Sequence, residues 1–154
     1  MSAVLVACGG SDEVEVSTPN ATKFFNRTAT FAVCQQTGSS CETATETSPE
    51  IVAASEDGMT LIYTNSPRRE IGFVDIKDVK APKALGALSM GGEPTSVTAL
   101  GVNALVAVNT STNFVSPSGK LVVVDIATQK VVAEIALAGQ PDSIARSKDG
   151  KSIV

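Results

Sequence analysis

The most reactive side chains in this chain belong to its three cysteines, Cys8, Cys34 and Cys41. No histidine occurs among the 154 residues, so this stretch lacks Ser-His-Asp and Cys-His catalysis and the commonest zinc ligand. An odd number of cysteines in an exported chain indicates that one thiol has a separate role. Their spacing divides the three into a single cysteine near the N-terminus and a pair further along.

Cys34 and Cys41 enclose a polar loop that contains Gly38. The flanking segments 28–33 and 42–47 have the composition of strand arms, so we expect a hairpin closed by a disulfide bond. Such a bond forms in an oxidising compartment. Two reduced buried thiols, or half of a metal site, are the alternatives, and the absence of a nearby histidine disfavours the metal site.

Two aspartates, Asp75 and Asp125, follow similar apolar runs and could together bind a cation or act as an acid and base pair. Equivalent residues of a repeat lie in separate units, however, and Asp at a strand end commonly accepts hydrogen bonds from a turn. We therefore expect both to stabilise turns. Asn65 and Asn109 also end apolar runs, and turn capping is expected there, with the mouth of a ring as the alternative.

Two other polar motifs could meet an anion. Arg68-Arg69-Glu70 is predicted to be a solvated loop, with contact to an anionic ligand as the alternative. Gly91-Gly92 resembles a phosphate-binding loop only superficially, because no helix N-terminus follows it, and a turn is expected. We assign no catalytic and no metal-binding residue from the sequence, and the ligand-binding residues remain unknown.

Residues 1–8 have features of an export signal. Leu5-Val6-Ala7 leads directly to Cys8, and the chain then becomes abruptly polar over residues 9–13. This motif resembles the lipobox of bacterial lipoproteins, which implies that Cys8 is the lipid attachment site. No basic residue precedes Cys8 and the apolar run is short for a signal peptide, so we expect a truncated signal. The alternative is a buried strand with a chance cysteine.

The lipobox resemblance implies a protein held in the bacterial envelope, in the periplasm or at the outer membrane, with the membrane as partner through a lipid anchor. Residues 9–26 are then predicted to form a flexible tether. Residues 27–48 are predicted to form N-terminal strands or a hairpin, and residues 49–154 to form the blades of a propeller.

An internal repeat carries the propeller prediction. Pro49, Pro94 and Pro141 begin three similar segments that stand 45 and 47 residues apart, and residues 71–76 match residues 121–126. Strands of the second unit are expected at about 95–100, 104–109, 120–126 and 131–137. An all-β propeller has four-stranded repeats of this length, whereas a β-sandwich would explain the strands but not the recurrence.

The run from Asp57-Gly58 to Leu61-Ile62-Tyr63-Thr64-Asn65 resembles the YVTN-type repeat of surface and periplasmic propellers, and the resemblance extends over residues 49–154. The Pro-Thr-Ser-Val and Val-Val-Asp-Ile segments are more loosely similar to lipoproteins with an esterase-like, phytase-like propeller domain. No catalytic residue of that family has a match in this chain. Phe73, Met90 and Phe114 are expected to be packing residues.

These features predict an envelope-anchored propeller lipoprotein with a binding or scaffold role, for a small-molecule or protein ligand that the sequence does not identify. The alternative is a hydrolase of phosphate or carboxylic esters, with its active site outside this stretch and with calcium in the full-length protein. No cofactor is evident in these residues. The net charge of −4 and the lack of a basic cluster beyond Arg68-Arg69 disfavour nucleic acid as a partner.

Two complete units and the start of a third are present, whereas closed propellers have roughly four to eight blades. We therefore expect the N-terminal fragment of a larger ring. Residues 27–34 are suited to complete the last blade of that ring. An open ring exposes strand edges and an apolar blade face, so we expect the isolated chain to associate in solution.

Overall fold

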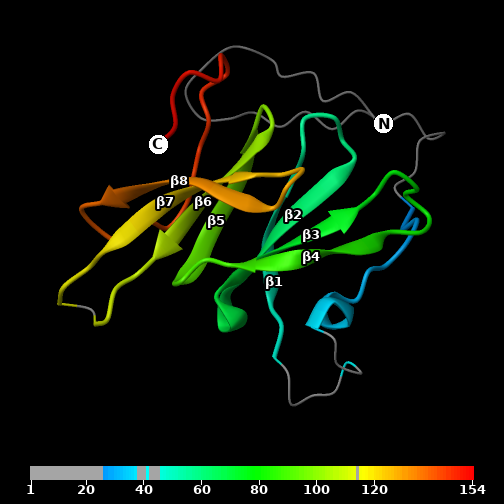
Figure 1. Ribbon diagram of the computed structural model, residues 1–154, viewed down its shortest axis with the longest axis horizontal. Helices are drawn as coiled ribbons and strands as arrows, with labels where there is room; N and C mark the ends of the chain where they lie inside the picture. Colours follow the sequence, from blue (N-terminus) through cyan, green and yellow to red (C-terminus); the bar gives the residue numbers. More distant parts are fainter. Residues whose placement is uncertain (1–25, 38–40, 42–45, 114) are drawn as a thin grey trace, which may run out of the picture.

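The structure is a computed structural model that describes residues 26–37, 41, 46–113 and 115–154. The described part contains two four-stranded antiparallel sheets and two short 3-10 helices. Within each sheet the strands follow chain order, so each sheet is one continuous meander (Figure 1). The predicted all-β architecture with two four-stranded blades is confirmed.

Blade 1 consists of β1 (Pro49–Ala54), β2 (Thr60–Asn65), β3 (Glu70–Asp75) and β4 (Lys83–Ser89). Blade 2 consists of β5 (Glu93–Leu100), β6 (Asn103–Asn109), β7 (Gly119–Asp125) and β8 (Lys130–Leu137). The strands of the second unit therefore lie within a few residues of their predicted positions. The inner strands, such as β6, are covered on both faces and are therefore apolar almost throughout. Turn residues at the ends of these apolar runs made the strands recognisable in the sequence.

Each blade has two faces, and cross-strand pairs show which residues share one. Ile62 pairs with Phe73, and both belong with Ile71 to the core between the blades. We call the side of blade 1 that carries these three residues its forward face. Tyr63 pairs with Gly72 on the opposite side, the rear face, which also carries Leu61 and Val74. In blade 2, the rear face carries Val106, Val122 and Val124 and the forward face carries Leu105, Ala107 and Leu121.

The hydrophobic core lies where the forward face of blade 1 meets the rear face of blade 2. Ile62, Ile71 and Phe73 from blade 1 form one cluster with Val106 and Val122 from blade 2, and all five are buried. Met90, from the connection between the blades, belongs to the same cluster. Phe73 and Met90 are thus packing residues as predicted, whereas Phe114 lies outside the described residues.

Residues 141–154, which we call the third unit, begin a further repeat. Arg146 and Ile153 form a β-bridge, and Ala145 and Val154 exchange two backbone hydrogen bonds of 2.7 and 3.0 Å. The turn between these arms has the same hydrogen bonds as the β1–β2 turn. In the two turns, Asp57 Oδ1 accepts from Met59 N (2.9 Å) and Asp149 Oδ1 accepts from Lys151 N (3.1 Å).

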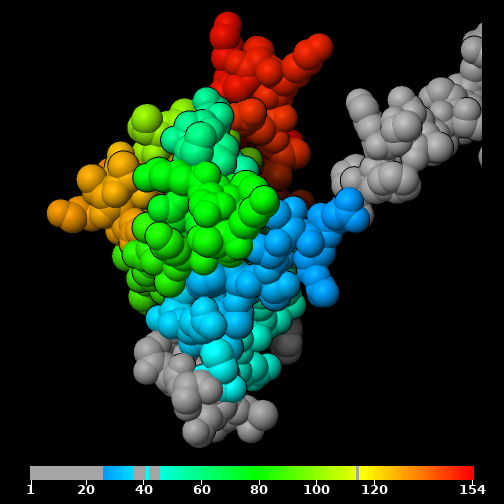
Figure 2. All heavy atoms as spheres, turned by 90° about the vertical axis from the view of Figure 1, so that its right-hand side faces the viewer, coloured from blue at the N-terminus to red at the C-terminus, as the bar shows by residue number. Residues whose placement is uncertain are grey.

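The expected N-terminal hairpin is not what the structure contains. Residues 26–32 have no strand, and Val33–Thr37 forms a 3-10 helix, η1. This segment, residues 26–37, which we call the strap, lies on blade 1 (Figure 2). The strap forms no ladder with either edge strand of a blade; instead Gln36 Nε2 donates to the backbone oxygen of Phe73 at 2.9 Å. Residues 27–34 are therefore not a strand in this structure, and their proposed place in the last blade of the ring stays a prediction.

Candidate functional site

The two predicted turn aspartates hold turns and lie in separate blades. Asp75 Oδ1 accepts a hydrogen bond from Lys77 N at 2.9 Å. Asp125 Oδ1 accepts from Thr128 N at 2.8 Å and from Thr128 Oγ1 at 2.7 Å. The hydroxyl and the amide of Thr128 hold the pKa of the Asp125 carboxyl below its ordinary value of 3.8. Each carboxylate belongs to its own strand end, so the two do not form an acid and base pair.

Asn65 and Asn109 both end strands; Asn109 caps the turn that follows it, as predicted, whereas the side chain of Asn65 makes no cap hydrogen bond to the 3-10 turn over residues 66–68. Asn65 is buried; its Oδ1 accepts from Ser48 N at 3.0 Å and its Nδ2 donates to Glu70 Oε1 at 3.1 Å. Asn109 Oδ1 accepts from Ser111 N at 2.9 Å. The amides are thus committed to local backbone and side-chain partners.

The two motifs that could have bound an anion form a local ion pair and turns. Arg68 Nε forms an ion pair of 2.9 Å with Glu70 Oε1, and Arg69 ends the 3-10 helix η2 (Ser66–Arg68) in the left-handed conformation. Gly91 has a φ of 66°, and an added Cβ at Gly92 would lie 2.5 Å from the backbone oxygen of Asn109. Gly91-Gly92 is therefore a turn that also allows close approach of the next blade.

Cys34 and Cys41 form a disulfide bond, with their Cα atoms 5.0 Å apart. The bond closes the loop at the end of η1 and thereby fixes one end of the strap. Cys8, the predicted lipid attachment site, lies outside the described residues, as does the whole of residues 1–25. Among the described residues, no three His, Cys, Asp or Glu side chains gather as a metal site would require.

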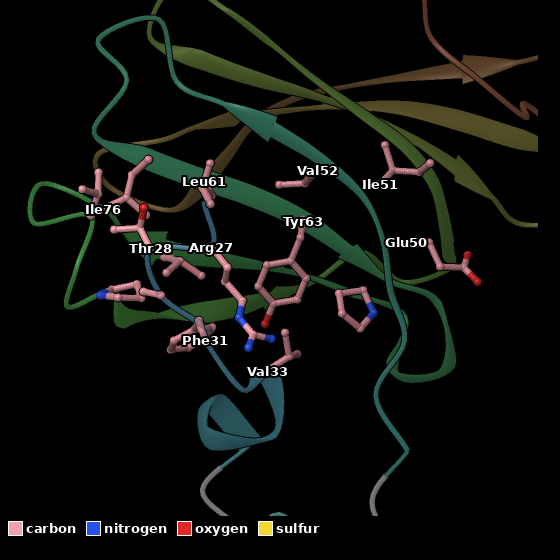
Figure 3. A pocket seen from close by; sticks show the side chains of 15 residues that line it. Arg27, Thr28, Phe31, Val33, Glu50, Ile51, Val52, Leu61, Tyr63 and Ile76 are labelled. Carbon is pink, nitrogen blue, oxygen red and sulfur yellow. The ribbon is translucent and has the colours of Figure 1, made fainter. Parts of the chain in front are cut away.

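The best-formed cavity lies between the strap and the rear face of blade 1. It has a volume of about 470 Å³ and is mainly apolar. Arg27 and Phe31 from the strap face Val52, Leu61 and Tyr63 from the sheet across it (Figure 3). Burial raises the pKa of Tyr63 to about 12, and the nearby Glu70 carboxylate adds to this shift. No sequence motif pointed to this cavity, because it depends on where the strap lies.

Arg146 of the third unit connects all three repeats. Its Nη1 donates to the backbone oxygen of Ala99 in blade 2 at 3.0 Å and to Glu56 Oε1 in the β1–β2 turn at 2.9 Å. Hydrogen bonds from the Gly101 backbone and from Arg146 hold the pKa of Glu56 below its ordinary value of 4.5. This arrangement, which sequence reasoning missed, joins residues 90 positions apart.

The stacked four-stranded blades define the chain as an all-β protein of the propeller class. Residues 21–154 match the model of the choice-of-anchor I domain family. The match covers most of the chain, and the chain therefore belongs to the choice-of-anchor I domain family. Membership of an anchoring family indicates an exported, surface-associated protein, and within the described residues no helix is long and apolar enough to cross a membrane.

Comparison with solved structures supports the fold. The chain is similar to hydrazine synthase of Kuenenia stuttgartiensis, with 24% identity and a TM-score of 0.57. The alignment covers 68% of this chain and 28% of that chain. At this identity the likeness extends to the stacked-blade fold alone. Comparison with curated protein sequences finds no significant match.

Proposed function

We propose that this chain is the blade-bearing part of a bacterial envelope lipoprotein with YVTN-type repeats, and that it binds or holds a partner. The observation that carries the binding role is the use of the polar residues. Asp75, Asp125, Asn65 and Asn109 hold turns and strand ends. A scaffold needs such rigidly held loops, because surface loops on a rigid frame are where binding residues are placed.

The proposed anchor is lipid on Cys8. Two observations support export: the family match over residues 21–154 and the disulfide between Cys34 and Cys41, which requires an oxidising compartment. Acyl chains on the first residue of the mature protein would hold it at the membrane surface, and residues 9–26 would separate the blades from the bilayer.

The anchor is tested by lipid labelling in a Gram-negative host. A basic, apolar leader is added before Ser2, and cells that express the chain are grown with alkyne-tagged palmitate. We expect label and membrane association for the natural chain and their loss for Cys8→Ser. The Cys34→Ser/Cys41→Ser variant is the matched control and should keep its label. A labelled Cys8→Ser chain would contradict the proposal.

The binding role is tested against hydrolysis with chromogenic esters. The full-length protein is incubated with p-nitrophenyl phosphate and p-nitrophenyl acetate, with and without calcium, because the hydrolase alternative has its active site outside this stretch. We expect no release of p-nitrophenol above that from a heat-denatured sample. Turnover that follows the folded fraction during urea denaturation would replace the binding role with an esterase or phosphatase activity.

A further inference from the structure

A polar cavity, which we call the junction cavity, lies between blade 1 and blade 2 at one end of their strands. Three segments line it: the β2–β3 connection with η2, the β4–β5 connection, and the start of the β6–β7 loop. Even-numbered strands end and odd-numbered strands begin at this end of the blades, so the three connections lie together (Figure 1). The cavity has a volume of about 670 Å³ and a mainly polar lining. Its walls are connections and strand ends, so the stacking faces of the blades take no part in it.

Arg69 brings an unpaired positive charge to the junction cavity. Its backbone holds the turn, since its N–H donates to the Ser66 oxygen at 3.0 Å and its oxygen accepts from Met90 N at 2.9 Å. The neighbouring Arg68 is paired with Glu70. The Arg69 guanidinium lines the cavity and forms no ion pair or side-chain hydrogen bond among the described residues. Its five N–H donors are therefore available to a ligand.

The glycine turn adds backbone donors to the same cavity. Gly91 is in the left-handed conformation, with a φ of 66°, and Gly92 is buried. Within the part of the chain that the structure describes, neither glycine amide has an acceptor, and the ladder of β5 begins only at Glu93. Successive backbone N–H groups next to a left-handed residue form a concave site for an anion. The turn therefore offers donors that the fold itself does not use.

The β6–β7 loop gives the cavity a rigid wall. Thr110 Oγ1 and Ser118 Oγ share a hydrogen bond of 2.8 Å. Ser111 Oγ donates to the Ser118 backbone oxygen at 3.1 Å and accepts from Ser118 N at 2.9 Å. Thr112 follows with an exposed side chain that also lines the cavity. A wall held in this way is ordered before a ligand arrives, which lowers the entropy cost of binding.

One carboxylate lines the cavity as well. Glu93 Oε2 accepts a hydrogen bond from Asn109 Nδ2 at 3.3 Å, where β5 begins and β6 ends. Its negative charge repels an anion, and this repulsion weakens with distance. We therefore expect an anionic group to lie on the Arg69 side of the cavity, away from Glu93.

The next junction along the chain lacks these groups, although it makes the same kind of contact between units. At both junctions a side-chain hydroxyl donates to the backbone oxygen of the proline that begins the next unit, at 3.1 and 3.0 Å. The connection after β8 has Ala138 in the place of Gly91, and residues 110–118, which form the loop equivalent to that of Arg69, contain no Lys or Arg. The stacking of units therefore requires neither the free guanidinium nor the left-handed glycine.

We propose that the junction cavity binds the phosphate or carboxylate group of a ligand, with Arg69 and the backbone amides of Gly91 and Gly92 as donors. A planar guanidinium forms paired hydrogen bonds with either group, and such charge-assisted bonds are stronger than neutral ones. This inference deepens the proposed binding role and rests on it, because it names the surface and the chemical class of the ligand. It does not depend on the lipid anchor.

Thermal unfolding of the full-length protein at increasing concentrations of inorganic phosphate, and separately of acetate, tests the proposal. Ionic strength is held constant with sodium chloride, so that only specific binding raises the unfolding temperature. Arg69→Asn removes the charge, and asparagine tolerates the left-handed backbone at this position, where φ is 54°. We expect the affinity for the anion to fall about tenfold or more in this variant.

Two further variants show whether the effect belongs to this cavity. Arg68→Gln removes the same charge one residue away, outside the cavity lining, and should bind the anion as the natural protein does. Glu93→Gln removes the opposing carboxylate and should raise the affinity. Circular dichroism of each variant confirms that the blades are folded.

Unchanged affinity in Arg69→Asn overturns the proposal, as does an equal loss in Arg68→Gln or the absence of any stabilisation by phosphate or acetate. These outcomes leave the lipid label on Cys8 and the ester assay untouched. Failure of the site and failure of the proposed function are therefore separate results.

Discussion

Blade 1 and blade 2 have the same strand order and the same pairing at their centres, yet they fill the rear face differently. In blade 2 the pair Val106 and Val122 packs against blade 1, and both residues are fully buried. In blade 1 the equivalent pair is Tyr63 and Gly72, and the tyrosine ring lies directly over the glycine. The rear face of blade 2, which packs against blade 1, is aliphatic, whereas the rear face of blade 1, which lies beneath the strap, carries one large aromatic ring.

The turns after the first strands differ too. Blade 1 has the longer turn, from Ser55 to Thr60, in which Asp57 accepts two hydrogen bonds and Gly58 has a φ of 70°. Blade 2 reverses direction through Gly101 and Val102 alone, with Gly101 at a φ of 59°. The third unit returns to the longer form. The first and third units thus share the longer turn, and blade 2 between them has the two-residue turn.

The largest expected effect is the loss of the shared core. Phe73→Ala removes a fully buried ring between the blades and should lower the free energy of unfolding by about 3–5 kcal/mol. Urea denaturation followed by circular dichroism measures this, and one transition is expected because the blades share a cluster. Phe31→Ala, in the partly exposed strap, is the control. Equal losses for both variants would show that the blades do not depend on this contact.

The second prediction converts the rear face of blade 1 into that of blade 2. Gly72→Val places a side chain where the Tyr63 ring lies and should destabilise the fold by about 1–3 kcal/mol. Adding Tyr63→Val recreates the Val106 and Val122 pair and should recover part of the loss. Thermal unfolding of the two single variants and the double variant forms the cycle. A double variant that loses the sum of both singles would refute the equivalence of the two pairs.

The third prediction concerns the stability of the longer turns in acid, and its expected effect is smaller. The Ser55 hydroxyl and the Met59 amide hold the pKa of Asp57 below its ordinary value of 3.8, and Asp149 is lowered in the same way by Ser147 and Lys151. This stabilisation is complete above the unfolded pKa and is lost as the pH falls through the lower folded value. Asp57→Asn should therefore be less stable than the natural chain at neutral pH, with the difference shrinking below about pH 4.

Thermal melts at a series of pH values check that prediction. Asp142→Asn is a suitable control, since the Asp142 side chain makes no hydrogen bond among the described residues. The same pH dependence in both variants would mean that the turn carboxylates have no special role.

The smallest expected effect is spectroscopic. Burial and Glu70 raise the pKa of Tyr63 to about 12, so Tyr63 favours the folded state below its ordinary pKa of 10.0, and this contribution fades as the pH rises toward about 12. Absorbance of the single tyrosinate should rise near the higher value in native protein and near the lower one in urea. A native midpoint at the ordinary value would mean that the rear face leaves the ring in water.

The blades were predictable from the sequence because their determinants are local. The recurrence of proline, the apolar runs and the Asp57-Gly58 turn all act over a few residues, and the strands follow from them. The turn roles of Asp75 and Asp125 were predictable for the same reason. Each depends on backbone within three residues of the side chain.

The strap and the links between units were not predictable, because they depend on contacts between distant residues. A polar segment such as residues 26–37 has strand-like composition, but a strand needs a free edge in the right register, and here Gln36 bonds the backbone of Phe73 instead. The two asparagines are not at equivalent positions, although the sequence suggested that they are. Thr60 of β2 and Asn103 of β6 are equivalent, because each pairs with the aspartate that ends the next strand, Asp75 or Asp125. Counted from these residues, β6 is one residue longer than β2. Asn65 therefore aligns with Val108 rather than with Asn109.

The bond from Arg146 to Glu56 has a mechanical consequence. It joins the first and third units directly, across the end of blade 2, and the same guanidinium nitrogen also holds Ala99 of blade 2. Tension applied at the C-terminus would therefore reach blade 1 through this bond as well as through the polypeptide. Under force, the third unit should therefore pull on blades 1 and 2 together, and its detachment requires both Arg146 hydrogen bonds to break.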